Sequence, residues 1–119
     1  MTYNMFIDDE RVPHDVTWAA QVDQEIYNNG QWIVVRNYDE VVECIMNLGL
    51  PSLVSFDHDL GENTPTGYDI AKMMCDLILD GVVLLPEDFR FRVHSKNPVG
   101  KKNIEEYMRA FVNYALSEK

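Results

Sequence analysis

The 119-residue sequence has only two cysteines and no long hydrophobic run. Cys44 and Cys75 lie among apolar residues in helical patterns, which is typical of buried free thiols rather than of a disulfide framework. No apolar run approaches the length of a membrane-spanning helix. The N-terminus also lacks the basic and apolar regions of a signal peptide. These absences predict a cytoplasmic protein without a membrane segment.

Basic residues are scarce as well, with 10 Lys and Arg against 20 Asp and Glu and a net charge of −10. Proteins that coat DNA or RNA bind by neutralising phosphates, so this balance argues against an extended nucleic-acid surface. It still allows a small phosphate substrate held at one local site, and it suits a protein that collects divalent cations. An acidic surface also supplies solubility without any further function.

The chain has the pattern of one α/β domain, residues 1–119. Its length suits a single domain that buries a core without disulfides or metals. We find no internal repeat, low-complexity tract or linker. Strand-like and helix-like segments alternate, which predicts a small, mostly parallel sheet flanked by helices.

Four strands are predicted, at residues 3–8, 32–36, 53–56 and 89–93. Capping signals and apolar periodicity predict helices at residues 37–49, 66–81 and from 97 onward. Residues 82–85 are left open as a short extra strand. The structure of residues 12–31 is also left open, because their helical spacing is imperfect.

Polar clusters follow three of the predicted strands, at residues 8–10, 57–59 and 94–95. The carboxyl ends of parallel strands lie at one edge of a sheet, where open α/β sheets bind ligands. We therefore expect three clusters that are far apart in the sequence to converge. A single acid at a strand end is more often a loop cap, but clusters at three strand ends favour a functional site.

Convergence brings four carboxylates together, from Asp8, Asp9, Asp57 and Asp59. These groups repel one another unless a positive charge lies among them. Mg²⁺ or Mn²⁺ takes oxygen ligands and would relieve the repulsion. The cluster therefore predicts a divalent cation as cofactor.

Two histidines add proton-transfer capacity near neutral pH. His58 lies between two aspartates, which favour its cationic form. His94 is followed by Ser95 and by a predicted helix start, where free N–H groups attract anions. Lys101, in the first turn of that helix, is either a solvated side chain or a phosphate contact.

The motifs at residues 6–11 with Pro13, 55–61, 66–69 and 93–100 with Asn103 resemble the cyclic-phosphate-processing receiver-like family. This family is a divergent branch of the response-regulator receiver fold, found in bacteria and phages. The resemblance covers nearly the whole chain, and its Asp-His-Asp-Leu-Gly and His-Ser-x-Asn-Pro-x-Gly motifs are fairly specific. It implies a flavodoxin-like three-layer sandwich with sheet order 2-1-3-4.

The resemblance also implies action on a cyclic phosphate, such as the 2′,3′-cyclic end of cleaved RNA or a cyclic nucleotide. By position it implies an active site of Asp8, Asp9, Asp57, His58, Asp59, His94 and Ser95. The resulting hypothesis is a metal-dependent phosphoesterase that acts on a small phosphate substrate or an RNA end.

In this hypothesis the aspartates hold the metal. One histidine is the general base and the other the general acid, with His94 favoured as the acid. Ser95 and Asn97 would stabilise charge on the phosphorane. Arg11 would contact the phosphate or form a salt bridge with a neighbouring acid.

Two other functions stay open. The first is a receiver-type signalling module phosphorylated on Asp57, although the Lys that ordinary receivers carry after a fifth strand is not found. The second is a non-catalytic protein whose acidic face binds a basic partner or mimics nucleic acid. The sequence leaves the oligomeric state open.

Overall fold

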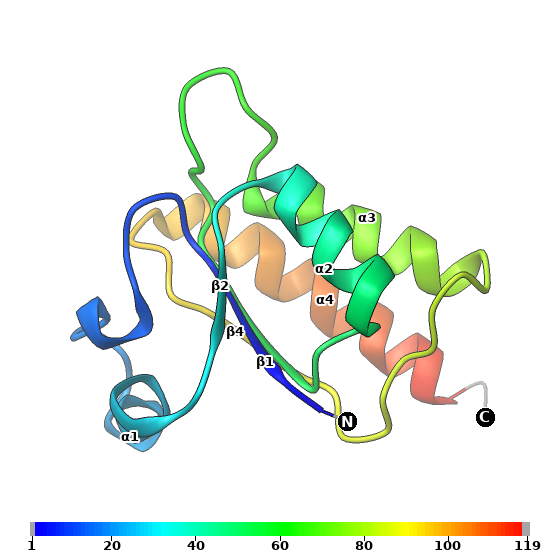
Figure 1. Cartoon of the computed structure of the whole chain (residues 1–119), viewed down its shortest axis with the longest axis horizontal. Helices are drawn as coiled ribbons and strands as arrows, with labels where there is room; N and C mark the ends of the chain where they lie inside the picture. The colour runs from blue at the N-terminus through cyan, green and yellow to red at the C-terminus, as the bar shows by residue number, and fades with distance from the viewer. Residues whose placement is uncertain (1, 118–119) are drawn as a thin grey trace.

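The computed structural model describes residues 2–117. A short 3₁₀ turn at Pro13–Asp15 lies between the first strand and the first helix. The strands and helices, in chain order, are β1 (Asn4–Ile7), α1 (Gln21–Asn29), β2 (Ile33–Val35), α2 (Tyr38–Leu48), β3 (Leu53–Phe56), α3 (Gly67–Leu79), β4 (Arg90–Val93) and α4 (Pro98–Ser117) (Figure 1).

The four strands form one parallel sheet in the order β2-β1-β3-β4, which confirms the predicted receiver-like topology. Ile7 pairs with Phe56, and Phe56 pairs with Val93. The residues that directly follow these three strands therefore leave the sheet side by side. Residues 82–85 form no strand, so β4 is an edge of the sheet.

The layers on the two faces of the sheet are unequal. Helices α2, α3 and α4 lie together on one face, and α1 alone lies on the other (Figure 1). The larger core is built on Met5, Ile7, Val54 and Phe56, and a smaller one on Phe6, Val16 and Tyr27. The face under α1 is thus covered over β1 and its neighbours, whereas β4 borders a cavity between α1 and α4.

The helix starts confirm the capping signals. The Asn37 side chain accepts a hydrogen bond from the N–H of Glu40, and Thr66 forms a capping box with Asp69. The segment left open by the sequence forms the 3₁₀ turn and α1. Cys44 and Cys75 are free thiols, and no helix within residues 2–117 combines the length and apolar character needed to cross a membrane.

Gly67 sets α3 against the carboxyl end of β3. Its N–H donates to the carbonyl oxygen of His58 at 2.8 Å. A Cβ at this position would lie 1.8 Å from the carbonyl oxygen of Asp57, so only glycine permits this approach. The contact fixes the helix beside the polar residues that follow β3.

We expect Gly67→Ala to lower the free energy of unfolding by about 2–3 kcal/mol, because a rigid backbone carbonyl must move to admit the methyl group. Urea denaturation measures the effect. Asn113→Ala, on the exposed surface of α4, is the control and should change stability by less than about 0.5 kcal/mol. Equal stability of Gly67→Ala and the wild type would contradict this packing.

Candidate functional site

The residues that follow β1, β3 and β4 form a buried polar cluster. Asp8, Asp57 and His94 are 1%, 6% and 3% exposed. Each offers one ligand atom within 4.8 Å of the others. The parallel register of the three strands thus brings together groups that are 86 residues apart in the sequence.

Asp8 is the most heavily hydrogen-bonded group of the cluster. Its Oδ1 accepts from the backbone N–H groups of Glu10 and Arg11, both at 2.9 Å. Its Oδ2 accepts from His94 Nε2 at 3.0 Å and from the Arg11 guanidinium at 3.3 Å. Burial by itself raises the pKa of Asp8, but the hydrogen bonds from His94, Arg11 and Glu10 outweigh it and hold this pKa well below its usual range.

Asp57 has the opposite balance. Burial raises the pKa of its carboxyl group, and the negative charge of Asp8 raises it further. The N–H of His58 donates to one oxygen at 2.9 Å, and Arg11 Nη1 lies 3.9 Å from the other. Asp57 is therefore the poorly compensated charge of the cluster, and it is the group that gains most from a bound cation.

His94 lies at the centre of a buried hydrogen-bond chain. Its ring has no exposed surface and stacks on Phe6 with 4.3 Å between centroids. Its Nδ1 bonds Ser55 Oγ at 2.7 Å, and Ser55 Oγ bonds the Tyr27 hydroxyl at 2.6 Å. The hydrogen bonds through Ser55 and Tyr27 thus hold the Nδ1 side of the ring, and Asp8 binds its Nε2 side. The ring therefore acts on the site through Asp8. A ring without exposed surface does not fit the expected role of direct proton donor.

His58 is also held behind a carboxylate. Its Nδ1 lies 2.9 Å from Asp59 Oδ1, and Asn97 Nδ2 donates to Asp59 Oδ2 at 3.2 Å. Hydrogen bonds from His58 and Asn97 lower the pKa of Asp59, whose side chain is 67% exposed. The ring packs beneath Gly100 of α4, where a Cβ would lie 2.3 Å from it. Close packing of α4 therefore fixes the His58–Asp59 pair at the rim of the site.

A cavity of about 330 Å³ opens above this cluster. Seven of the ten residues expected at the site line it: Asp8, Asp9, Arg11, Asp57, Asp59, Ser95 and Asn97. The two histidines do not line it, because they lie behind the carboxylates that they hold. Lys101 lines a different cavity, beside β4.

Several residues at the site carried no signal in the sequence analysis. Lys96 lines the cavity, and its ammonium group lies 4.2 Å from the centroid of the Trp18 ring. The Arg11 guanidinium lies 4.9 Å from the same ring. Arg36 donates to the carbonyl oxygens of Asp8 and Arg11 at 3.1 and 2.7 Å. Trp18 thus positions Arg11 and Lys96, the two basic side chains of the cavity. Arg36 holds the backbone between Asp8 and Arg11 in place.

The donor set fits a hard divalent cation. Asp8 and Asp57 present buried carboxylates to the same space, and oxygen is the ligand that Mg²⁺ and Mn²⁺ prefer. His94 Nε2 is already bonded to Asp8, so the two aspartates are the ligands that this geometry favours. Arg11 Nη1 lies 3.3 Å from Asp8 Oδ2 and 3.9 Å from Asp57 Oδ2, so a cation between the two carboxylates would compete with its guanidinium.

Comparison with protein families gives one match. A family model described as a cyclic-phosphate processing receiver domain matches residues 3–110, which include every residue of the site. Comparison with curated proteins finds no match, and comparison with solved structures finds none.

We expect Asp57→Asn to raise the melting temperature of the metal-free protein at neutral pH by roughly 2–5 °C, because it removes a buried charge that faces Asp8. Differential scanning fluorimetry in chelator measures this. Asp59→Asn is the matched control: it removes a stabilised, exposed charge and should give no gain. An equal gain in both variants would mean that overall charge, rather than the Asp8–Asp57 contact, sets the effect.

The gain from Asp57→Asn should depend on pH with a definite sign. The pKa of Asp57 is raised in the folded state, so the penalty for its charge is present at neutral pH and disappears as the group takes up a proton. The difference in melting temperature between variant and wild type should therefore shrink as the pH falls toward the ordinary aspartate value of 3.8. A difference that grows in acid would contradict the raised pKa.

Proposed function

The chain belongs to the family of cyclic-phosphate processing receiver domains, and from this premise we propose that it is a phosphoesterase that opens a cyclic phosphodiester with the help of a divalent cation. The observation that carries the proposal is the meeting of Asp8, Asp57 and Arg11 at one cavity. In this proposal the two carboxylates bind the metal ion and the guanidinium binds the phosphate.

Arg11 and Lys96 are the groups that bind the phosphate in this proposal. Both line the cavity and both contact the ring of Trp18, which holds them beside the carboxylates. Arg11 has two roles: it balances the aspartates in the metal-free protein and turns to the phosphate when a cation takes its place. An anionic substrate would be repelled by the acids of this cavity without that cation.

A divalent cation held by Asp8 and Asp57 would lower the pKa of a water molecule and polarise a phosphoryl oxygen. The water oxygen forms a bond to phosphorus and one P–O bond of the ring breaks, which leaves a phosphomonoester. Asp59, backed by His58, accepts the proton of the attacking water, and the released oxygen takes a proton from solvent. Ser95 and Asn97 line the cavity and offer hydrogen bonds to the charge that builds up on phosphorus.

His94 is a positioning residue in this mechanism. Its bond to Asp8 Oδ2 fixes the orientation of that carboxylate and lowers its pKa, as a metal ligand would require. Ser55 and Tyr27 continue the chain and fix the ring. Loss of such an outer partner weakens a metal site by about 10–100-fold in affinity or activity.

The position of Lys96 favours a second candidate, the receiver-type module. It lines the cavity that also contains Asp57, although it follows β4 and not a fifth strand. In that function a small phosphodonor transfers its phosphoryl group to the Asp57 carboxylate, with a new O–P bond and loss of the donor's leaving group. A stable phospho-aspartate on Asp57, without turnover of any cyclic phosphate, would favour this candidate.

The test of the enzymatic proposal is hydrolysis of a panel of cyclic phosphates. It contains 2′,3′-cyclic nucleotides, an RNA oligonucleotide with a 2′,3′-cyclic end and 3′,5′-cyclic nucleotides, each with Mg²⁺, with Mn²⁺ and with chelator. We expect metal-dependent formation of a phosphomonoester from at least one member. Absence of turnover across the whole panel would overturn the proposal.

Variants separate the assigned roles. Asp57→Asn should abolish turnover, since it removes a metal ligand. His94→Gln should lower turnover by about 10–100-fold and raise the metal concentration needed for half-maximal rate, since it acts through Asp8. His14→Ala, on the exposed surface, is the control and should match the wild type. An unchanged metal requirement in His94→Gln would contradict the positioning role.

A further inference from the structure

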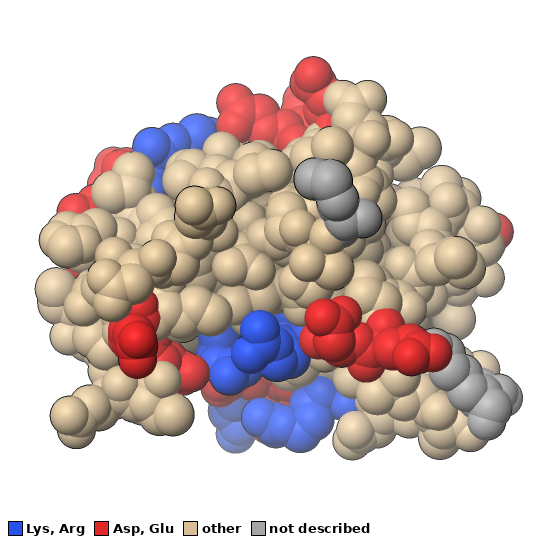
Figure 2. All heavy atoms as spheres, turned by 60° about the horizontal axis from the view of Figure 1, so that its bottom comes forward, with Lys and Arg blue, Asp and Glu red and all other residues tan. Residues whose placement is uncertain are grey.

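A second cavity, of about 480 Å³, runs along the open edge of β4 between α1 and α4. We call it the β4 groove. Figure 2 brings its face forward and shows Lys and Arg side chains gathered near the middle, with Asp and Glu on both sides. The basic residues that line the groove are Arg90, Arg92, Lys101 and Arg109, four of the ten Lys and Arg in the chain.

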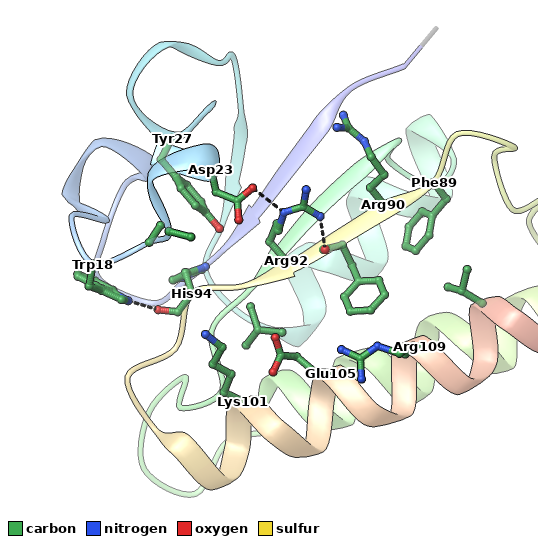
Figure 3. Close-up of a pocket in the computed structure, with 15 residues that line it drawn as sticks. Trp18, Asp23, Tyr27, Phe89, Arg90, Arg92, His94, Lys101, Glu105 and Arg109 are labelled. Carbon is green, nitrogen blue, oxygen red and sulfur yellow. Dashed lines mark hydrogen bonds and ion pairs between the residues drawn. The ribbon is translucent and has the colours of Figure 1, made fainter. Parts of the chain in front are cut away.

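Three of these cations have no acidic partner. Arg92 is paired with Asp23 at 3.0 Å and also donates to the Phe91 carbonyl oxygen (Figure 3). Within residues 2–117, no carboxylate lies within ion-pairing distance of Arg90, Lys101 or Arg109. Two acidic residues, Asp23 and Glu105, also line the groove, so its lining has four basic and two acidic side chains. This basic excess, in a protein with net charge −10, favours an anionic ligand.

Backbone N–H groups and aromatic residues also line the groove. The N–H groups of Arg90 and His94 donate to β3, so the alternate residues Phe91 and Val93 turn their N–H groups to the free edge. Lys101 and Arg109 lie eight positions apart on α4 and both line the groove; in Figure 3 the Lys101 side chain points toward β4, and that of Arg109 lies along α4 toward Glu105. Three aromatic residues, Trp18, Phe89 and Phe91, also line the groove, and the two phenylalanines pack in part against the larger core. Cations, backbone donors and aromatic rings together are the features that bind single-stranded nucleic acid.

The groove is continuous with the proposed active site. β4 passes from the groove directly into Ser95 and Lys96, which line the site cavity. Trp18 lines the groove, and its ring contacts the two cations of the site. The groove and the site cavity are therefore adjacent: Arg11 and Lys96 lie among the acids of the site cavity, and the four basic residues of the groove follow along the strand.

We propose that the β4 groove binds the sugar–phosphate backbone of a single-stranded oligonucleotide whose terminal cyclic phosphate lies in the site cavity. This inference rests on the proposed function and names its substrate class: a nucleic-acid end rather than a free cyclic nucleotide. A free nucleotide would fill the site cavity alone and leave three unpaired cations without a role. Arg90 and Arg92 on the edge strand also disfavour the addition of a peptide strand, since charged edges resist such pairing.

Fluorescence anisotropy with a labelled RNA of roughly eight nucleotides tests the groove directly. One probe ends in a 2′,3′-cyclic phosphate and the other in a 3′-hydroxyl. We expect the double variant Arg90→Ala/Arg109→Ala to weaken binding of both probes at least tenfold at low salt. The slope of log affinity against log salt should fall by about 1.4, the value for two phosphate contacts on a single strand.

The matched control is Lys72→Ala/Lys102→Ala, which removes two cations outside the groove and should bind both probes as the wild type does. Equal weakening in the two double variants would overturn the proposal, because it would show an effect of net charge alone. Tighter binding of an acidic peptide than of RNA, lost in the groove variant, would also overturn it in favour of peptide docking.

The two proposals fail in different ways. Suppose that wild type and Asp57→Asn both bind RNA through the groove but no cyclic phosphate is hydrolysed. This result supports RNA binding by the β4 groove and overturns the enzymatic proposal. Suppose instead that a cyclic mononucleotide is hydrolysed but RNA binding does not depend on Arg90 and Arg109. This result supports the enzymatic proposal and overturns RNA binding by the β4 groove.

Discussion

The rest of the structure depends on the Asp8 carboxylate, which is 1% exposed and whose pKa hydrogen bonds hold well below its usual range. A buried carboxylate keeps its charge only when hydrogen bonds and positive charge replace the lost water. His94 and Arg11 do this from two directions, one from the end of β4 and one from the loop after β1. In the proposed function, Arg11 turns to the phosphate when a metal ion replaces it beside the aspartates. The proposal thus couples metal binding and substrate binding through one side chain.

The smaller layer of the fold supports the His94 ring. Phe6 stacks on this ring, and Tyr27 of α1 completes the chain through Ser55. The short helix α1 is thus tied to the middle of the sheet, above β1 and β3. Asp23 of α1 pairs with Arg92 of β4, and no further strand pairs with β4 among residues 2–117, so the edge of β4 stays open. The same arrangement that buries the histidine therefore leaves a basic groove beside it.

The sequence predicted the sheet well, because each strand signal was local. The range 53–56 is the range of β3; the ranges predicted for β1 and β2 extend one residue beyond the observed strand at each end, and that for β4 starts one residue early. The parallel order also placed Asp8, Asp57 and His94 at one edge.

The burial of His94 was not predictable, since it depends on residues 12–31, whose spacing favoured no structure. Ser55 did carry a signal, as a polar residue within a buried strand, on the face that strand alternation shares with Phe6. Trp18 carried none, because its contacts with Arg11 and Lys96 exist only in the folded chain.

The most direct test of the account is the position of a metal ion relative to Arg11. Anomalous diffraction from crystals soaked in Mn²⁺ locates the ion without reference to activity. The account predicts one ion between the carboxylates of Asp8 and Asp57, with the Arg11 guanidinium moved away from both and His94 still bonded to Asp8. An Arg11 that stays between the two aspartates, with no ion beside them, would contradict the coupling of metal and phosphate on which the mechanism is built.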